Sequence, residues 1–396
     1  MSPARIGVLV GLDLRQRVRR PGFYVLLGVF FLVVVGITWL GSLVFSGSGS
    51  VASGMVSVAI YGVLLMTVLV TPTFTGNAIN GDRDSATLAP VQVTLATTAE
   101  ILVAKLLAGW VTGLVYLVAA VPALVFALIR GQFAPPAPNW AGLAGQDTIH
   151  PATLIVSILI LAVEIGVFAA IGVGLSAVIA RPLFSVAASY LVVMLLVIGT
   201  VIAFGLGTFA ARSSVSTLTE SPDQVYVSTG EASRLPSCDE SSEPCLEPRP
   251  DVTPQCVEVR GSGEAPRYDY VWWILAANPF VVLADATPTG YDGSGYPVDL
   301  FGQIKYGIRS AQHPPELIRD DWADPCDGKP FVEGEYTDPP LSELDRQTPR
   351  EAIASSTPSW FVGLGIQVLL AAGLMLWGAS RTRTPARRTP PGSRIA

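Results

Sequence analysis

The side chains that usually perform catalysis or bind metals are few in this sequence. It contains two histidines, His150 and His313, which lie far apart in the chain. It also contains four cysteines: Cys238, Cys245, Cys256 and Cys326. A zinc site needs closely spaced cysteine pairs with histidines nearby, and the spacings here are wider. The sequence therefore predicts no metal site and gives no support to thiol–histidine hydrolysis.

The lysines indicate that the sequence has no phosphate-binding loop. Such a loop has the pattern G-x-x-x-x-G-K-[ST], because its backbone amides and its lysine surround the phosphates. None of the lysines, Lys105, Lys305 and Lys329, lies in this pattern. Gly328-Lys329-Pro330 lacks both the upstream glycine and the following hydroxyl. We therefore expect no catalytic residue, no cofactor and no ATP hydrolysis on this chain, which is not expected to be an enzyme.

All four cysteines lie in one acidic region. Residues 208–357 contain 25 of the 31 acidic residues and 11 of the 25 Lys and Arg residues, so the region has a net charge of −14. Clustered cysteines outside apolar segments are typical of disulfides in an oxidising compartment, rather than of free or metal-bound thiols. We expect disulfides here. The sequence leaves open how the cysteines pair, above all which one pairs with Cys326.

The rest of the chain is apolar enough to be a membrane protein. Half of all residues are hydrophobic, and the mean hydropathy is +0.50. Crossing the bilayer as a helix takes about 20 mostly apolar residues. Six segments of the sequence qualify: 23–46, 52–75, 101–129, 152–180, 184–207 and 359–380. An isolated apolar segment in lipid must be helical to pair its backbone groups. The predicted fold class is an all-α polytopic membrane protein with six transmembrane helices and a large, disulfide-stapled extracellular domain between helices 5 and 6.

Arginines beside these segments predict the orientation, because short cytoplasmic segments retain positive charge. Arginines occur at 5, 15, 17, 19 and 20 in the N-terminal segment and at 381, 383, 387, 388 and 394 in the C-terminal tail. Both termini are therefore expected in the cytoplasm, as an even number of spans requires. The chain would be a multi-pass protein of the cell membrane, with its acidic region outside.

This orientation divides the sequence into five parts. Residues 1–22 are expected to form a cytoplasmic amphipathic helix, with a disordered leader as the alternative. Residues 23–207 hold transmembrane helices 1 to 5, with a cytoplasmic loop at 76–100. The extracellular domain follows at 208–358, then the sixth helix at 359–380 and a basic cytoplasmic tail at 381–396. The apolar segment Val271 to Ala284 is too short to span and contains Asn278-Pro279, so we interpret it as a core or interfacial element.

The loop at 76–100 has the most informative sequence of the chain. It begins with a charged group, Asp82, Arg83 and Asp84, and ends with Thr97-Thr98-Ala99-Glu100. This ending has the pattern of a capping box, in which Thr97 accepts from a first-turn amide and Glu100 accepts from the amide of Thr97. A helix should therefore begin here. Taken by itself, the charged group fits a solvated turn as well as it fits a functional segment.

Two stretches of this region resemble the ABC-2 type transporter permeases. They are Gly81-Asp82-Arg83-Asp84-Ser85-Ala86-Thr87-Leu88 and Glu100-Ile101-Leu102-Val103-Ala104-Lys105-Leu106-Leu107. In that family the loop is similar to a coupling helix that inserts into a separate nucleotide-binding subunit. The chain departs from the family pattern where Ser85-Ala86 replace an acidic residue.

The resemblance implies a function, a partner and a set of coupling residues. The chain would be the permease subunit of an ATP-driven exporter, present as a homodimer or with a paired permease in the lipid bilayer. ATP and Mg²⁺ would be bound by the separate ABC subunit, and no nucleic acid is implied. The residues that would couple to this ATPase are Asp82, Arg83, Asp84, Thr87, Leu88 and Glu100.

Glu164 is the one ionisable residue that lies deep in a predicted span. A buried acid in lipid is costly, so it usually faces a partner, a cavity or a pathway. We treat Glu164 as a candidate for the translocation pathway, with a structural hydrogen bond to a neighbouring helix as the equal alternative. The glycines and alanines that follow it indicate close helix packing and a place inside the bundle.

Two other functional classes fit parts of the sequence. A membrane-anchored extracellular binding or sensing protein would use the acidic domain as its functional part, although five spans before that domain are many for an anchor. A secondary transporter would show inverted repeats or interrupted helix pairs, which we do not see. A neighbouring gene for an ATPase would favour the permease over both.

Overall fold

The structure is a computed structural model that describes residues 2–45, 51–84, 97–133, 149–223, 255–293, 295–315, 317–319 and 347–382. The chain divides into two compact units. The first comprises Met1–Gly207, Asp269–His313 and Thr348–Ala396, and the second comprises Thr208–Tyr268 and Pro314–Gln347. Residues Asp269–His313, which the sequence led us to place in the domain 208–358, therefore belong to the first unit.

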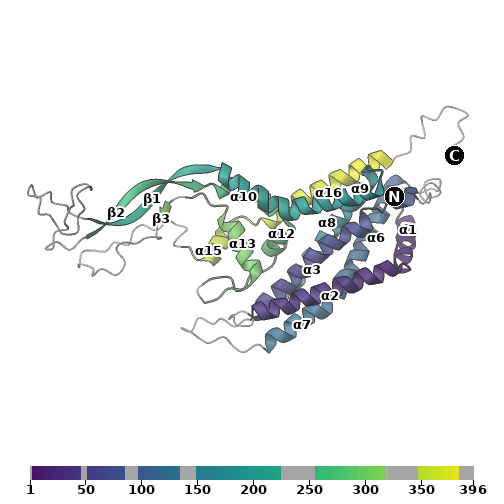
Figure 1. The fold of residues 1–396 in the computed structure, drawn as a ribbon, viewed down its shortest axis with the longest axis horizontal. Helices are drawn as coiled ribbons and strands as arrows, with labels where there is room; N and C mark the ends of the chain where they lie inside the picture. The colour runs from purple at the N-terminus through teal and green to yellow at the C-terminus, as the bar shows by residue number, and fades with distance from the viewer. Residues whose placement is uncertain are drawn as a thin grey trace, which may run out of the picture. The chain divides into compact units, whose positions relative to one another are not determined.

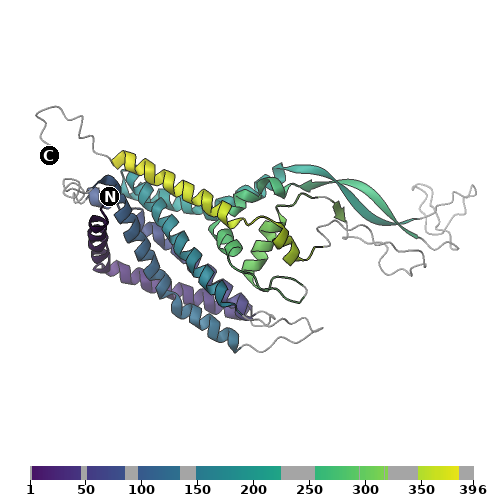
Figure 2. The same ribbon diagram turned by 180° about the vertical axis from the view of Figure 1, so that it is seen from behind.

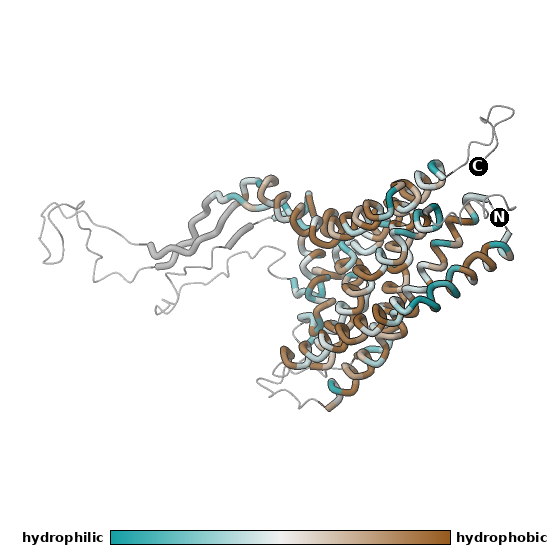
Figure 3. The backbone as a smooth tube through the Cα atoms, turned by 45° about the vertical axis from the view of Figure 1, so that its right-hand side comes forward, coloured by the Kyte–Doolittle hydropathy of each residue, from teal (hydrophilic) through white to brown (hydrophobic). Residues whose placement is uncertain are grey.

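The first unit contains six helices that are long and apolar enough to cross a membrane, which confirms the predicted number (Figure 1). Their bounds are Pro21–Val44, Val51–Arg83, Thr98–Gly131, Pro151–Val178, Pro182–Ala210 and Trp360–Thr382. Hydrophobic residues make up most of the helical part of the chain (Figure 3). The chain is a multi-pass membrane protein.

Prolines set the starts of several of these helices. Pro21, Pro151 and Pro182 open α2 (Pro21–Val44), α8 (Pro151–Val178) and α9 (Pro182–Met194). Proline is favoured there because the first amide of a helix has no partner to lose. The third span is divided into α6 (Thr98–Ala119) and α7 (Val121–Gln132), where Pro122 lacks the amide that would continue the hydrogen bonding.

The centre of the unit is α3 (Val51–Thr75). In its most apolar window 72% of residues are buried, compared with 17% in Pro21–Val44 and 22% in Pro182–Ala210. The outer helices α2 and α9 instead expose large apolar side chains, including Leu32 and Leu191. Exposed apolar faces of this extent suit a lipid environment.

Small residues join α8 to α16 (Trp360–Thr382), which lie side by side (Figure 2). A Cβ atom added at Gly174 would lie 2.9 Å from the carbonyl carbon of Leu374, and one at Gly378 would lie 2.7 Å from the Cβ of Ala177. These glycines let the two backbones approach closely. The close packing that the sequence predicts after Glu164 is therefore confirmed.

The fifth span contains a π-helical turn, η1 (Leu195–Gly199), before α10 (Thr200–Ala210). A π-helical turn disturbs the regular ladder of backbone hydrogen bonds, and such turns often mark special sites. Asn278 uses this turn: its Nδ2 donates to the carbonyl of Val197 at 2.8 Å and to Thr200 Oγ1 at 3.0 Å. Its Oδ1 accepts from the amide of Phe280 at 2.9 Å and caps the next helix.

The segment with Asn278-Pro279 forms two short helices, α11 (Tyr268–Ala276) and α12 (Pro279–Ala286). Val282 and Leu283 of α12 are completely buried, and this helix packs against α8, α16 and η1. Neither helix is long enough to span. Of the two alternatives left open by the sequence, the core element fits α12.

A buried polar network fixes the start of α16. Asp285 on α12 pairs with Arg309 of α13 (Leu300–Ser310) at 2.7 Å, and its Oδ2 accepts from the amides of Ser359 and Trp360 at 2.6 and 2.9 Å. Lys305, also on α13, donates to the carbonyl of Thr287 at 2.6 Å. A buried charge of this kind is tolerated because it is paired and hydrogen-bonded. A further short helix, α15 (Pro349–Ser355), packs against α13.

The second unit contains a β-sheet, so the all-α expectation does not hold there. β1 (Arg212–Asp223) pairs antiparallel with β2 (Gln255–Pro266), and β3 (Leu317–Arg319) joins β1 in parallel. The strand order is β2-β1-β3. Valine and threonine occur along β1 and two valines occur along β2, and such residues favour strands.

The predicted disulfides are not tested by this unit. Cys256 lies on β2 opposite Pro222. Cys238, Cys245 and Cys326 lie outside the described residues.

Candidate functional site

The charged group predicted for the loop after the second span lies on a short helix, α4 (Asn80–Asp84). This helix is held against the end of α8. Ser176 Oγ accepts from the amides of Ile79 and Asn80 at 2.9 and 3.3 Å, and Asn80 Nδ2 donates to the carbonyl of Ile179 at 2.5 Å. Thr87 and Leu88, the other residues expected in this coupling segment, lie outside the described residues.

Arg83 faces the same helix end. Its Nη2 donates to the carbonyl of Ala177 and its Nη1 to Asn80 Oδ1, both at 3.5 Å. A cation near the last carbonyls of a helix is favoured by the partial negative charge there. Arg83 therefore helps to hold α4 on α8, a role that the sequence did not suggest.

The predicted capping box at the start of α6 is confirmed. The amide of Glu100 donates to Thr97 Oγ1 at 3.3 Å, and the amide of Thr97 donates to Glu100 Oε2 at 2.8 Å. The other carboxylate oxygen of Glu100 accepts from the backbone amide of Ser2 at 2.7 Å. Glu100 thus joins the start of α6 to the start of α1 (Pro3–Val18), the helix that we expected at the N-terminus.

Lys105 brings three segments together. Its Nζ lies 2.9 Å from Asp13 Oδ1 on α1 and 2.7 Å from Asp82 Oδ2 on α4. Asp13 also pairs with Arg17 at 2.9 Å. These side chains are partly buried, with 14% of Lys105, 13% of Asp13 and 29% of Asp82 exposed. We name Asp13, Arg17, Asp82 and Lys105 the charged cluster.

The charged cluster holds Asp13 in its ionised form. Burial by itself would raise the pKa of the Asp13 carboxyl, but the nearby Arg17 and Lys105 cations and their hydrogen bonds outweigh it and hold the pKa below its ordinary value. The docking of α1 onto the bundle therefore has an electrostatic component in addition to apolar packing.

Apolar contacts support the same arrangement. Leu9 of α1 packs against a small core formed by Ala78, Ile79, Ile101, Leu102, Val173 and Ala177, with Met375 and Ala379 alongside. These residues come from the ends of the second, third, fourth and sixth spans. Leu9 therefore anchors α1 at this end of the bundle.

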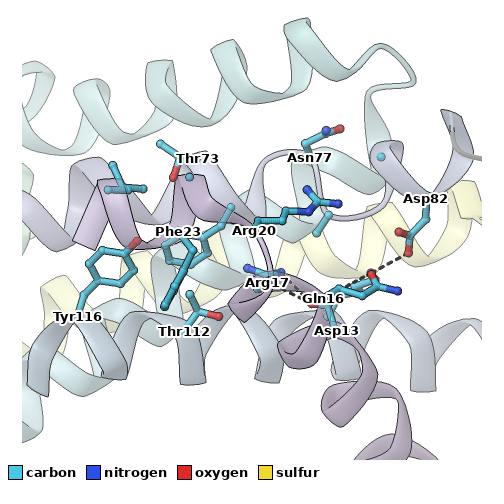
Figure 4. A pocket seen from close by; sticks show the side chains of 16 residues that line it. Asp13, Gln16, Arg17, Arg20, Phe23, Thr73, Asn77, Asp82, Thr112 and Tyr116 are labelled. Carbon is cyan, nitrogen blue, oxygen red and sulfur yellow. Dashed lines mark hydrogen bonds and ion pairs between the residues drawn. The ribbon is translucent and has the colours of Figure 1, made fainter. Parts of the chain in front are cut away.

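A cavity of about 990 Å³ lies beside the charged cluster, between α1, α2, α3 and α6 (Figure 4). All four residues of the cluster line it, together with Gln16, Arg20, Gly22, Phe23, Leu26, Thr73, Phe74, Asn77, Ala78, Gly81, Thr112 and Tyr116. Figure 4 shows aromatic side chains at one end of the cavity and charged ones at the other.

Glu164 lies on α8 and is completely buried, as the sequence predicts for the bundle interior. Neither of its carboxylate oxygens forms a hydrogen bond within the described part of the chain. The amide of Gln367 on α16 approaches it but donates to the carbonyl of Ala277 at 3.1 Å. The role of Glu164 stays a prediction, and this residue does not line the cavity beside the charged cluster.

The sequence reasoning missed Asp13, Arg17 and Lys105 as one group. Part of this group could have been found from the sequence. Asp13 and Arg17 are four residues apart, a spacing at which oppositely charged side chains pair on a helix. Lys105 is also the only lysine before residue 305. The contact between these segments spans 92 residues of sequence, so spacing alone does not reveal it.

The chain matches no protein-family model, and no curated protein matches it.

Proposed function

We propose that this chain is the permease subunit of an ATP-driven exporter of the ABC-2 type, which forms the translocation path and couples to separate ATPase subunits. One observation carries the proposal: Lys105 joins α1 to α4 through Asp13 and Asp82. The N-terminal helix and the predicted coupling segment are thereby tied to the start of the third span. A subunit that binds α4 would act on all three.

The contacts of α4 indicate how such a movement would spread. Through Asp82 a displacement of α4 would pull on α1 and α6, and through Asn80 and Ser176 it would pull on α8. Since α8 is packed closely on α16, the sixth span would follow. Packed helices with close backbone contacts move as bodies and do not deform continuously.

The proposal assigns the chemistry to a partner. ATP and Mg²⁺ would be held by an ABC nucleotide-binding subunit on the cytoplasmic side, and a second permease would complete the path. Glu164 stays the candidate for that path, because it is a buried carboxyl without a hydrogen-bond partner among the described residues. Asp82, Arg83 and Asp84 would lie near the ATPase, together with Thr87 and Leu88.

The test is affinity purification of the tagged chain from its native membrane. We expect a co-purifying ATPase with the unaltered chain and its loss when Asp82, Arg83 and Asp84 are all replaced by alanine. Arg130→Ala is the matched control, since Arg130 is an exposed cation at the other end of the third span. Equal recovery of the ATPase with the triple variant and the control would contradict the assignment of the coupling segment.

A further inference from the structure

Two of the residues that line the cavity beside the charged cluster each have a buried polar atom that lacks a hydrogen-bond partner among the described residues. Among the described residues, neither Arg17 Nη1 nor the hydroxyl of Tyr116 forms a hydrogen bond. Only 1% of Tyr116 is exposed, and both residues line the cavity. A buried donor without a partner costs free energy, so such atoms point to a group that binds there.

The charges of the cavity favour an anion. The charged side chains that line the cavity are Asp13 and Asp82 against Arg17, Arg20 and Lys105, an excess of one positive charge. The two acids are already paired with Lys105 and Arg17. No carboxylate pairs with Arg20 in the described part of the chain. Arg20 and the Nη1 group of Arg17, which Asp13 does not engage, are therefore the groups that would receive a phosphate, to which guanidinium donors are well matched.

The other end of the cavity is apolar and aromatic. The ring of Tyr116 packs against Phe23 and Phe74, with centroids 5.8 and 6.0 Å away. Leu26 completes this surface, and the Arg17 guanidinium lies 5.5 Å from the centre of the Phe74 ring. A charged end joined to an apolar end matches an amphiphile better than a fully polar solute.

The position of the cavity matches the headgroup level of a bilayer. Arg17 and Arg20 lie just before Pro21, where the first apolar helix begins, and Phe23 and Leu26 lie in its first two turns. Basic pockets between membrane-spanning helices are typical sites for anionic lipid headgroups. The cavity is also larger than a phosphate alone, with a volume of about 990 Å³.

We propose that this cavity binds a membrane phospholipid with one net negative charge. Its phosphate lies against Arg17 and Arg20, the Tyr116 hydroxyl donates to an ester oxygen of the lipid, and the start of an acyl chain lies along Phe23, Leu26 and Phe74. The proposal is independent of the proposed transport function, because it depends on the cavity alone.

The test measures lipid binding by the full chain in neutral detergent, with native mass spectrometry and titrated phosphatidylglycerol. Arg20→Gln removes an exposed cation and should weaken binding about fivefold. Tyr116→Phe removes only the hydroxyl and should weaken binding about threefold. Arg15→Gln is the control, because Arg15 is an exposed cation in the last turn of α1 that does not line the cavity. The melting temperature without lipid shows whether each variant is folded.

The comparison of probes decides the source of the phosphate. The proposal expects saturable binding of phosphatidylglycerol, weak binding of phosphatidylcholine and no competition by glycerol phosphate or inorganic phosphate. Equal binding of both lipids, or an equal effect of Arg15→Gln and Arg20→Gln in folded protein, would overturn it. Competition by inorganic phosphate at the same concentration as the lipid would also overturn it and would assign the cavity to a soluble phosphate compound.

Discussion

Replacing Lys105 with methionine tests whether the charged cluster fixes α1 and α4 to the bundle. Methionine keeps most of the volume and the apolar stem of lysine but removes the ammonium group that lies between Asp13 and Asp82. The variant leaves two negative charges near each other with one cation fewer. Lys105→Met should therefore destabilise the folded chain.

The size of this loss of stability follows from how exposed the paired side chains are. Exposed ion pairs contribute about 0 to 1 kcal/mol, and breaking a fully buried pair costs about 3–5 kcal/mol. Lys105 and Asp13 are 14% and 13% exposed, while Asp82 is 29% exposed and is screened more by solvent. We expect a loss of about 2 kcal/mol in the free energy of unfolding, between these limits.

Equilibrium unfolding in mixed micelles of a mild and a denaturing detergent measures this loss. Arg130→Gln is the matched control, because it also removes one positive charge from the third span but lies at an exposed position. The double variant Lys105→Met/Asp82→Asn should recover part of the stability, since Asp13 keeps its pair with Arg17 and Asp82 no longer carries a charge that lacks its lysine. If Lys105→Met unfolds together with the control, the cluster does not hold these helices.

Three further predictions follow from other parts of the structure. Arg309→Met leaves Asp285 buried without its cation and should cost about 3–5 kcal/mol of unfolding free energy, measured in the same micelles; a cost below about 1 kcal/mol would contradict the network. Gly378→Ala should lower the melting temperature, whereas Gly373→Ala on the same helix should not, because a Cβ meets nothing within 4 Å there; equal melting would refute close packing at α16. Because the pKa of Asp13 is lowered from its ordinary value of 3.8, its contribution is complete above that pH and is lost as the pH falls below it, so hydrogen exchange of α1 should rise only below about pH 4; exposure of α1 at pH 5 would contradict this.

The membrane-spanning helices could be predicted from the sequence because their signal is local. A run of about 20 apolar residues has one stable conformation in lipid, so composition alone locates each span. The capping box at Thr97 and Glu100 is local in the same way, since both residues lie within one turn. These features depend on neighbours in sequence and need no knowledge of the fold.

The charged cluster and the cavity could not be predicted in this way. Asp13 and Lys105 pair although they are 92 residues apart in the sequence, and Asp285 and Ser359 form a hydrogen bond although they are 74 residues apart. Such contacts are fixed by how helices pack, which the sequence of one helix does not specify. The sheet was not predicted because its strands β1 and β2 lie in a polar, acidic region, for which the sequence predicted no secondary structure.

The proposed function is tested most directly by the ATPase activity of the chain purified by affinity from its native membrane. The account predicts an ATPase subunit in stoichiometric amount and ATP hydrolysis that elutes with the complex. It also predicts that the Asp82, Arg83 and Asp84 triple variant, purified alongside Arg130→Ala, has lost both. Absence of any ATPase from the unaltered chain would contradict the account and favour a membrane-anchored binding or sensing protein.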